Sequence, residues 1–137
     1  ANHTVTLNGA SINNVASVSR VIANSAFDFT LAATSGTNSW RIYDFDGAGN
    51  SSDGVNDGEV AGIQFVDFKN LQGGSGVDTF DIDTNFTGTI SGGSGADIFN
   101  IKAAATNITG GADDDSFVFY SAGSVTTASG NDGNIEQ

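Results

Sequence analysis

Aspartate recurs at nearly constant spacing in the second half of the chain, each time at the end of a glycine-rich segment. Asp78, Asp97 and Asp115 share this spacing, the second step being one residue shorter than the first, and a degenerate fourth copy ends at Asp132. Carboxylate oxygens are the ligands that Ca²⁺ prefers, and glycine-rich turns let backbone carbonyls point at the same centre. These residues therefore predict calcium binding.

The spacing predicts where the ions would lie. The three segments run from Gly73 to Asp78, from Gly92 to Asp97 and from Gly110 to Asp115, and would form two sites between successive turns of the chain. One such segment alone is more typical of an ordinary tight turn, whereas three copies in register favour a repeated site. The predicted ligands are Gly73, Gly74, Gly76, Asp78, Gly92, Gly93, Gly95, Asp97, Gly110, Gly111, Asp113, Asp115 and Asp132. In the third copy Ala112-Asp113 replaces Ser-Gly, so that a residue with a Cβ takes the third glycine's place.

A repeat of this length predicts a solenoid, and the residues between the glycine-rich turns predict its strands. Phe80 and Ile82 alternate with Thr79 and Asp81, as expected of a strand with one face in a core. We predict an all-β fold, a right-handed parallel β-helix or β-roll with about 18–19 residues per turn. Parallel strands lie about 4.8 Å apart, so stacked carboxylates would repel each other by about 3 kcal/mol at an effective dielectric constant of 20 unless a cation lies between them.

The chain is predicted to be a single domain, residues 1–137. Residues 1–58 would hold an N-terminal cap and early strands, and residues 59–137 the calcium-binding turns. The cap is either irregular β-structure or a short helix, since Val15, Val18 and Ile22 have helical spacing. The polar stretch 46–59 is predicted to be a loop. A second and weaker calcium loop would use Asp44, Asp46, Asp53 and Asp57, although a solvated loop without an ion fits this stretch better.

Composition excludes several functions. The formal charge is −12, from 16 acidic and four basic side chains, which disfavours binding to nucleic acid or to anionic lipid. No apolar run is long enough for membrane insertion, and there is no cysteine for a thiolate metal site. His3 is the only histidine and lies near a terminus, so we expect no enzyme of the Ser-His-Asp or Cys-His type. Asp81 and Asp83 as a glycosidase pair are a far weaker interpretation than surface residues.

The glycine-rich segments resemble the nonapeptide G-G-x-G-x-D-x-U-x of the RTX (haemolysin-type) family of secreted bacterial proteins. The resemblance covers about residues 71–135 and implies a parallel β-roll that binds Ca²⁺ through its turns, type I secretion and a location outside the cell. The intervening turns 83–85 and 102–105 lack the motif, so calcium would line one side only, and Lys102 on the other side fits this asymmetry. The stretch from Asn38 to Gly74 also resembles units of giant bacterial surface adhesins.

Together these patterns predict a calcium-stabilised structural or adhesive module of a secreted or cell-surface bacterial protein. Its expected partners are calcium ions, with a surface glycan or neighbouring modules of the same protein as further candidates. The alternative is a carbohydrate-binding or polysaccharide-processing accessory module, in which Trp40, Tyr43 or Tyr120 stacks on sugar rings instead of belonging to the core. A self-assembling surface-layer protein is a third alternative, which no residue favours.

Overall fold

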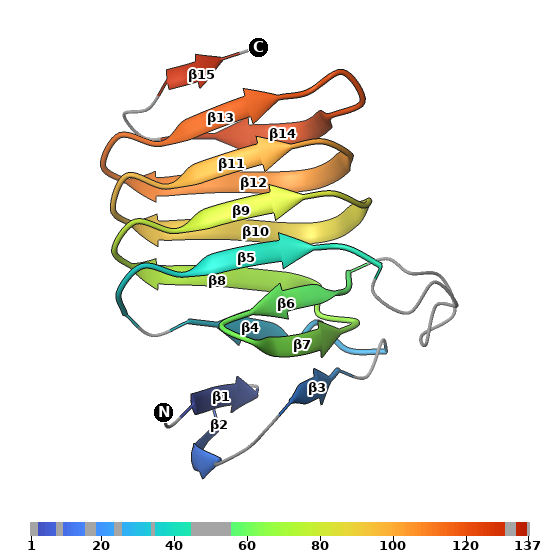
Figure 1. The fold of residues 1–137 in the computed structure, drawn as a ribbon, viewed down its shortest axis with the longest axis vertical. Helices are drawn as coiled ribbons and strands as arrows, with labels where there is room; N and C mark the ends of the chain where they lie inside the picture. The colour runs from blue at the N-terminus through green and yellow to red at the C-terminus, as the bar shows by residue number, and fades with distance from the viewer. Residues whose placement is uncertain are drawn as a thin grey trace.

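The computed structural model is a stack of flattened coils made of strands (Figure 1). It describes residues 19–23, 26–33, 35–44 and 56–130, together with the backbone of strands β1, β2 and β15. These residues contain no helix, and the coils wind in a right-handed sense (Figure 1). The predicted all-β parallel solenoid is therefore confirmed.

Two sheets form the long walls of the stack. The eight-stranded wall has the order β15 (Asn134–Glu136), β13 (Ser116–Phe119), β11 (Ile98–Ile101), β9 (Thr79–Ile82), β5 (Ser39–Ile42), β6 (Gly58–Val60), β7 (Ile63–Val66) and β3 (Arg20–Ile22). The five-stranded wall has the order β14 (Ser124–Ser129), β12 (Ala104–Ala112), β10 (Phe86–Ser94), β8 (Asn70–Ser75) and β4 (Thr30–Ala32). A separate antiparallel hairpin of β1 (His3–Leu7) and β2 (Ala10–Val15) contacts the stack through β4.

The pairing registers reproduce the period of the sequence. Thr79 pairs with Ile98 and Ile98 with Ser116, so the first coil is one residue longer than the second. The extra residue of the longer coil lies in β10, where the pairing with β12 shifts between Phe86 and Thr89. Gly88 lies at this shift with a φ of 140°, and a Cβ there would collide with the carbonyl oxygen of Lys69. A bulge in β10 thus absorbs the change of coil length.

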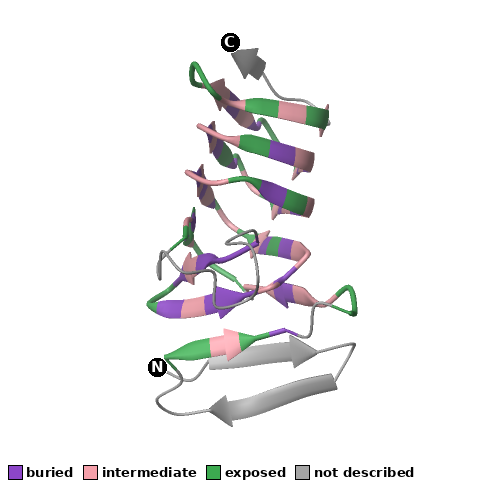
Figure 2. Cartoon of the chain, turned by 90° about the vertical axis from the view of Figure 1, so that its right-hand side faces the viewer, coloured by how far each residue is buried: buried purple, intermediate pink, exposed green. Residues whose placement is uncertain are grey.

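Stacked aromatic rings fill the centre of the solenoid. Trp40, Phe80, Phe99 and Phe117 follow one another with centroid distances of 5.4, 5.0 and 4.9 Å, and each is fully buried. The strands alternate between buried and more exposed residues along their lengths (Figure 2). This continuous core holds the coils in register, so the residues at each corner of one coil lie above their counterparts in the next.

One excursion interrupts the regular coiling. After β5 the chain returns through β6, which pairs antiparallel with both β5 and β7. The prediction of a loop over residues 46–59 is wrong for its last two residues, because Gly58 and Glu59 belong to β6, where Glu59 pairs with Arg41. Residues 45–55 lie outside the described residues. Parallel stacking already includes β3, β4 and β5, which precede the predicted start of the calcium-binding turns at residue 59.

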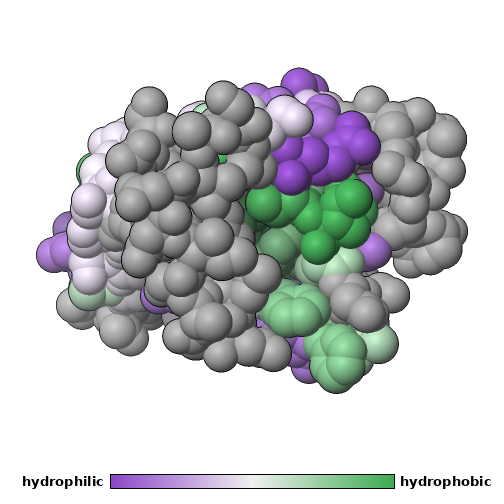
Figure 3. Space-filling view, turned by 90° about the horizontal axis from the view of Figure 1, so that it is seen from below, coloured by the Kyte–Doolittle hydropathy of each residue, from purple (hydrophilic) through white to green (hydrophobic). Residues whose placement is uncertain are grey.

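The N-terminal end of the stack is built from strands, as in the first of the two predicted caps. Val15 ends β2 and Ile22 ends β3, so neither belongs to the predicted helix, and Val18 lies outside the described residues. Seen from below, hydrophobic side chains gather on part of this end (Figure 3). Ile22 and Phe27 are exposed large hydrophobic residues of this region.

Candidate metal centre

The glycine-rich segments form one long edge of the solenoid, where each coil passes from the five-stranded wall to the eight-stranded wall (left edge of Figure 1). Two residues of each turn have a positive φ, a conformation that L-residues with a side chain rarely adopt. They are Gly74 and Gly76 in the first turn, Gly93 and Gly95 in the second, and Gly111 and Asp113 in the third. Asp113 therefore takes the third glycine's place, as the sequence indicated.

Asp113 compensates for the glycine that it replaces. Its Oδ2 accepts a hydrogen bond of 3.0 Å from the backbone N–H of Gly95. One coil earlier the equivalent N–H, that of Gly76, donates instead to the backbone carbonyl of Ser94 at 2.8 Å. A side-chain oxygen thus replaces a main-chain oxygen in holding the third turn to the second.

The first glycine of each turn has a different role, because its φ is not positive. A Cβ on Gly73, Gly92 or Gly110 would collide with Oδ2 of the aspartate at the end of the same turn. At Gly73 and Gly92 it would also collide with the carbonyl oxygen of the first glycine in the following coil. The missing side chain therefore makes room for the carboxylate inside the corner, a reason that the sequence analysis did not give.

The three aspartates form a ladder inside this corner. Asp78, Asp97 and Asp115 have exposed fractions of 0%, 0% and 2%. Oδ1 of Asp97 accepts the backbone N–H of Asp78 at 2.8 Å, and Oδ1 of Asp115 accepts that of Asp97 at 3.0 Å. One carboxylate oxygen of each rung is therefore used to tie neighbouring coils together.

The other oxygen of each carboxylate, Oδ2, is buried and has no hydrogen-bond partner in Asp78, Asp97 or Asp115. Oδ2 of Asp78 and the carbonyl oxygen of Gly92 lie against the same face of Gly73, and Oδ2 of Asp97 and the carbonyl oxygen of Gly110 lie against Gly92. Each junction thus places a side-chain oxygen that has no donor beside a backbone carbonyl oxygen. Because a buried polar atom without a partner is unfavourable, these junctions fit a bound cation or a proton.

The electrostatics of the ladder follow from this burial. Loss of solvent, and then repulsion by Asp78 and Asp115, raise the pKa of Asp97 to about 6, against the opposing effect of the hydrogen bond from Asp78. Burial also raises the pKa of Asp115, with smaller contributions from Asp113 and Asp114. Ionisation of the carboxylates at this corner is therefore unfavourable unless a positive charge binds beside them.

The sequence analysis missed Asn38, which forms the first rung of the same ladder. Its backbone N–H donates to Oδ1 of Asp78 at 2.7 Å, and its side-chain Nδ2 donates to the same oxygen at 2.8 Å. The signal was present, because Ser35-Gly36-Thr37-Asn38 matches Ser75-Gly76-Val77-Asp78. The excursion through β6 and β7 lengthens the chain between these two copies to about twice the usual repeat, so the period of the others does not reveal the first.

The opposite edge of the solenoid also carries aspartates, but the chain supplies their counter-charges. Nζ of Lys102 lies 3.2 Å from Asp81 and 2.9 Å from Asp83, and Nε of Arg41 lies 2.9 Å from Asp83. Burial would raise the pKa of Asp83, but the hydrogen bonds from Lys102 and Arg41 outweigh it and hold the pKa below its usual value. Lys102 thus lies at the corner where the sequence predicted it.

The second predicted calcium loop is described only in part. Asp46 and Asp53 lie outside the described residues, as does Asp132. Asp44 is exposed, whereas Asp57 is fully buried and accepts the backbone N–H of Asp67 through Oδ1 at 3.1 Å. Within the described residues, no group of three or more His, Cys, Asp or Glu side chains converges as a metal site. Any site on the glycine-rich edge must therefore draw on backbone carbonyls as well as carboxylates.

Comparison of this chain with protein-family models, with curated proteins and with solved structures finds no match. Its geometry and chemistry must therefore carry the functional argument. Across the part of the chain that the structure describes, no helix has the length and apolar character to cross a membrane.

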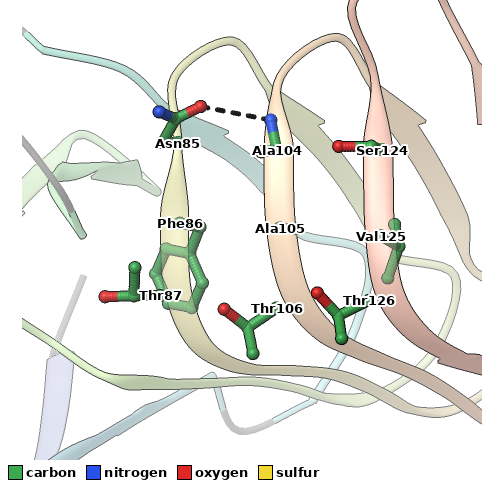
Figure 4. Close-up of a pocket in the computed structure, with 9 residues that line it drawn as sticks. All are labelled: Asn85, Phe86, Thr87, Ala104, Ala105, Thr106, Ser124, Val125 and Thr126. Carbon is green, nitrogen blue, oxygen red and sulfur yellow. Dashed lines mark hydrogen bonds between the residues drawn. The ribbon is translucent and has the colours of Figure 1, made fainter.

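A groove of about 310 Å³ on the five-stranded wall is a second candidate for binding (Figure 4). Thr87, Thr106 and Thr126 lie side by side along it on three neighbouring strands, and Asn85 closes one end through a hydrogen bond to the backbone N–H of Ala104. No carboxylate or histidine lines it. Trp40 is buried in the core and cannot stack on a sugar ring, whereas Tyr120, another aromatic residue named for the carbohydrate-binding alternative, is exposed.

Proposed function

We propose that this chain is a calcium-stabilised structural module, in which Ca²⁺ binds between successive coils on the glycine-rich edge. The module would serve as a rigid spacer or adhesive segment of a secreted or cell-surface bacterial protein, without catalytic activity of its own. The resemblance of the three turns to RTX repeats supports both the ion and the location outside the cell.

One observation carries the proposal: a buried carboxylate oxygen without a donor faces a backbone carbonyl at successive junctions of the ladder. Oδ2 of Asp78 lies beside the carbonyl oxygen of Gly92, and Oδ2 of Asp97 lies beside the carbonyl oxygen of Gly110. A cation between each pair would satisfy both acceptors and offset the repulsion between rungs. The same ion would join two coils, so binding would stabilise the fold itself.

The donor atoms favour calcium over other metals. The ladder offers carboxylate and carbonyl oxygens, and the chain has no cysteine and one histidine, which lies in β1. Oxygen-only sites suit Ca²⁺ and Mg²⁺, and Ca²⁺ tolerates irregular geometry with six to eight ligands, whereas Mg²⁺ demands a near-ideal octahedron. Ligands from two separate coils of backbone fit the more tolerant ion.

A proton is the competing occupant of each junction, because a neutral carboxyl could donate from Oδ2 to the glycine carbonyl. The pKa of Asp97 is raised to about 6, so at neutral pH its carboxyl would still be mostly ionised. The cation is therefore the favoured partner at neutral pH, and the proton takes over in acid.

The proposed affinity suits a module that folds outside the cell. Extracellular calcium sites commonly bind in the range of about 10⁻⁴–10⁻³ M. With a formal charge of −12, the unfolded chain would repel itself in a low-calcium cytosol and would fold on meeting calcium outside.

Calorimetric titration with calcium and thermal unfolding monitored by circular dichroism test the proposal together. Wild type is expected to bind calcium at neutral pH and to unfold at a higher temperature than in a chelator, with magnesium far less effective. Asp97→Ala should weaken binding. Asp114→Ala is the matched control, because Asp114 is exposed in the same type of turn and its removal changes the net charge equally.

The proposal is wrong if wild type shows no heat of calcium binding and unfolds at the same temperature in calcium and in chelator. It is also wrong if Asp114→Ala lowers calcium binding as much as Asp97→Ala, since the effect would then arise from net charge and not from the ladder.

A further inference from the structure

The first rung of the ladder is an amide and not a carboxylate. Asn38 is the structural counterpart of Asp78, because Ser39 pairs with Thr79 in the parallel register of β5 and β9. The backbone agrees: the carbonyl of Asn38 accepts the N–H of Thr79 at 2.9 Å, as the carbonyl of Asp78 accepts that of Ile98 at 2.8 Å. The junction below Asp78 therefore has the same main-chain frame as the junction above it.

The side chain of Asn38 donates where the aspartates only accept. Its Nδ2 lies 2.8 Å from Oδ1 of Asp78, 3.0 Å from the carbonyl oxygen of Gly36 and 3.4 Å from that of Gly73. Gly73 is the counterpart of Gly92 and Gly110, since β8 and β10 pair Gln72 with Ser91. The amide N–H thus points at the carbonyl of Gly73, the counterpart of the Gly92 carbonyl that lies beside the unpartnered Oδ2 of Asp78 in the next junction.

We propose that Asn38 ends the calcium ladder: its amide takes the place of the ion at the first junction, so the metal sites begin at Asp78. This inference rests on the proposed function. An amide carries two N–H donors, and donors to a carboxylate form the stronger class of hydrogen bond. The first junction is therefore complete without a metal, whereas the following junctions each lack a positive group.

The same logic applies to the other rungs. An asparagine in place of Asp78 or Asp97 keeps an oxygen for the N–H of the preceding coil and gives the glycine carbonyl a donor. Asparagine should therefore remove an ion and also remove the need for it, whereas alanine removes the ion and leaves the N–H of the preceding coil without its acceptor. A purely structural role for Asn38 would not produce this difference.

Two variants and one control test the inference, with native mass spectrometry for the number of bound calcium ions and circular dichroism in chelator for folding. Asn38→Asp should bind one calcium ion more than wild type and should need more calcium to fold. Asp78→Asn should bind one ion fewer and should fold at lower calcium than wild type. Thr37→Asp is the matched control, because Thr37 is exposed in the same turn, and it should leave the number of ions unchanged.

The inference fails if Asn38→Asp binds as many calcium ions as wild type, or if Asp78→Asn needs as much calcium to fold as Asp78→Ala. Calcium binding by wild type would then leave the proposed function standing. If none of the proteins binds calcium, the proposed function fails as well. If Asn38→Asp does not fold at any calcium concentration, its amide is a structural group that no ion can replace, and the inference is overturned on that result.

Discussion

Both long edges of the solenoid carry acidic side chains, but the two edges neutralise them differently. On one edge Lys102 and Arg41 bridge Asp81 and Asp83 within the chain. On the other edge Asp78 and Asp97 are fully buried, and each keeps one oxygen without a partner. The chain has four basic side chains for 16 acidic ones, so it cannot complete both edges by itself.

The two edges differ in how far their stability depends on the surrounding solution. An edge with its own cations is stable wherever those cations are protonated, and exposed ion pairs of this type contribute about 0–1 kcal/mol each. An edge of buried carboxylates is stable only when the medium supplies a positive charge. The electrostatic free energies at this edge are larger than those of exposed ion pairs, because its carboxylates are no longer solvated by water. The ladder is therefore the part of the fold that the environment can switch.

The largest expected effect distinguishes the two edges by mutation. Asp97→Ala removes a proposed calcium ligand and leaves the buried N–H of Asp78 without its acceptor, so in saturating calcium it should lower the free energy of unfolding by roughly 4 kcal/mol. Asp83→Ala should lower it by about 1 kcal/mol or less, since its partners Lys102 and Arg41 remain partly exposed. Chemical denaturation of both variants in calcium and in chelator measures this. Equal losses would remove the distinction between the edges.

The next effect concerns the space inside the glycine-rich corner. Gly92→Ala would bring a Cβ against Oδ2 of Asp97 and the carbonyl oxygen of Gly110, and should destabilise the protein by roughly 3 kcal/mol with or without calcium. Gly62→Ala is the control, because Gly62 has a φ of 77° and open space around it. Its cost should be about 1 kcal/mol, from backbone strain alone. Thermal unfolding of the pair decides whether crowding or strain is the reason for glycine at this corner.

The two edges should also respond to pH with opposite signs. The pKa of Asp97 is raised to about 6 in the folded protein, so calcium-free protein should become more stable as pH falls from 7 toward 4, by at most roughly 3 kcal/mol. The pKa of Asp83 is lowered by its partners, so its contribution is present above pH 4 and is lost as pH falls further. Denaturation in chelator across this range should give a maximum of stability in mild acid.

Calcium should reverse the pH response of the glycine-rich edge, because protons compete with the ion for the same carboxylates. In saturating calcium the protein should lose stability as pH falls from 7 to 5. A calcium-free protein whose stability falls steadily over the same interval would contradict the raised pKa of the ladder.

The smallest effect is expected on the basic edge. Lys102→Met removes the bridge between Asp81 and Asp83 but keeps an apolar side chain of similar length. It should lower the free energy of unfolding by under about 1 kcal/mol and leave calcium affinity within the error of a titration. A marked loss of calcium binding would mean that the two edges are coupled through the core.

The repeat made much of this architecture predictable from sequence. Phe80, Phe99 and Phe117 share one position in successive coils, and the alternation around Phe80 predicted strands with one face in a core. The same spacing placed Asp78, Asp97 and Asp115 at one corner. These predictions were possible because the same type of residue recurs at the same position of each coil.

The period of the repeat alone does not predict the remaining features, because they depend on tertiary contacts. Asn38 belongs to the ladder through the pairing of β5 with β9, and the strands β6 and β7 lie between these two in the sequence. The role of Gly92 depends on where the carboxylate of Asp97 lies, and not on the conformation of the glycine itself. Gly88 marks a bulge that only the register between β10 and β12 reveals.

A crystal structure with calcium, located by its anomalous scattering, tests the central claim most directly. The account predicts an ion between successive coils on the glycine-rich edge, within about 2.3–2.6 Å of Oδ2 of Asp97 and the carbonyl oxygen of Gly110. The equivalent position next to Asn38 should hold no ion. Crystals grown in saturating calcium at neutral pH that show no ion at the corner, with Oδ2 of Asp97 within hydrogen-bond distance of the carbonyl oxygen of Gly110, would contradict it.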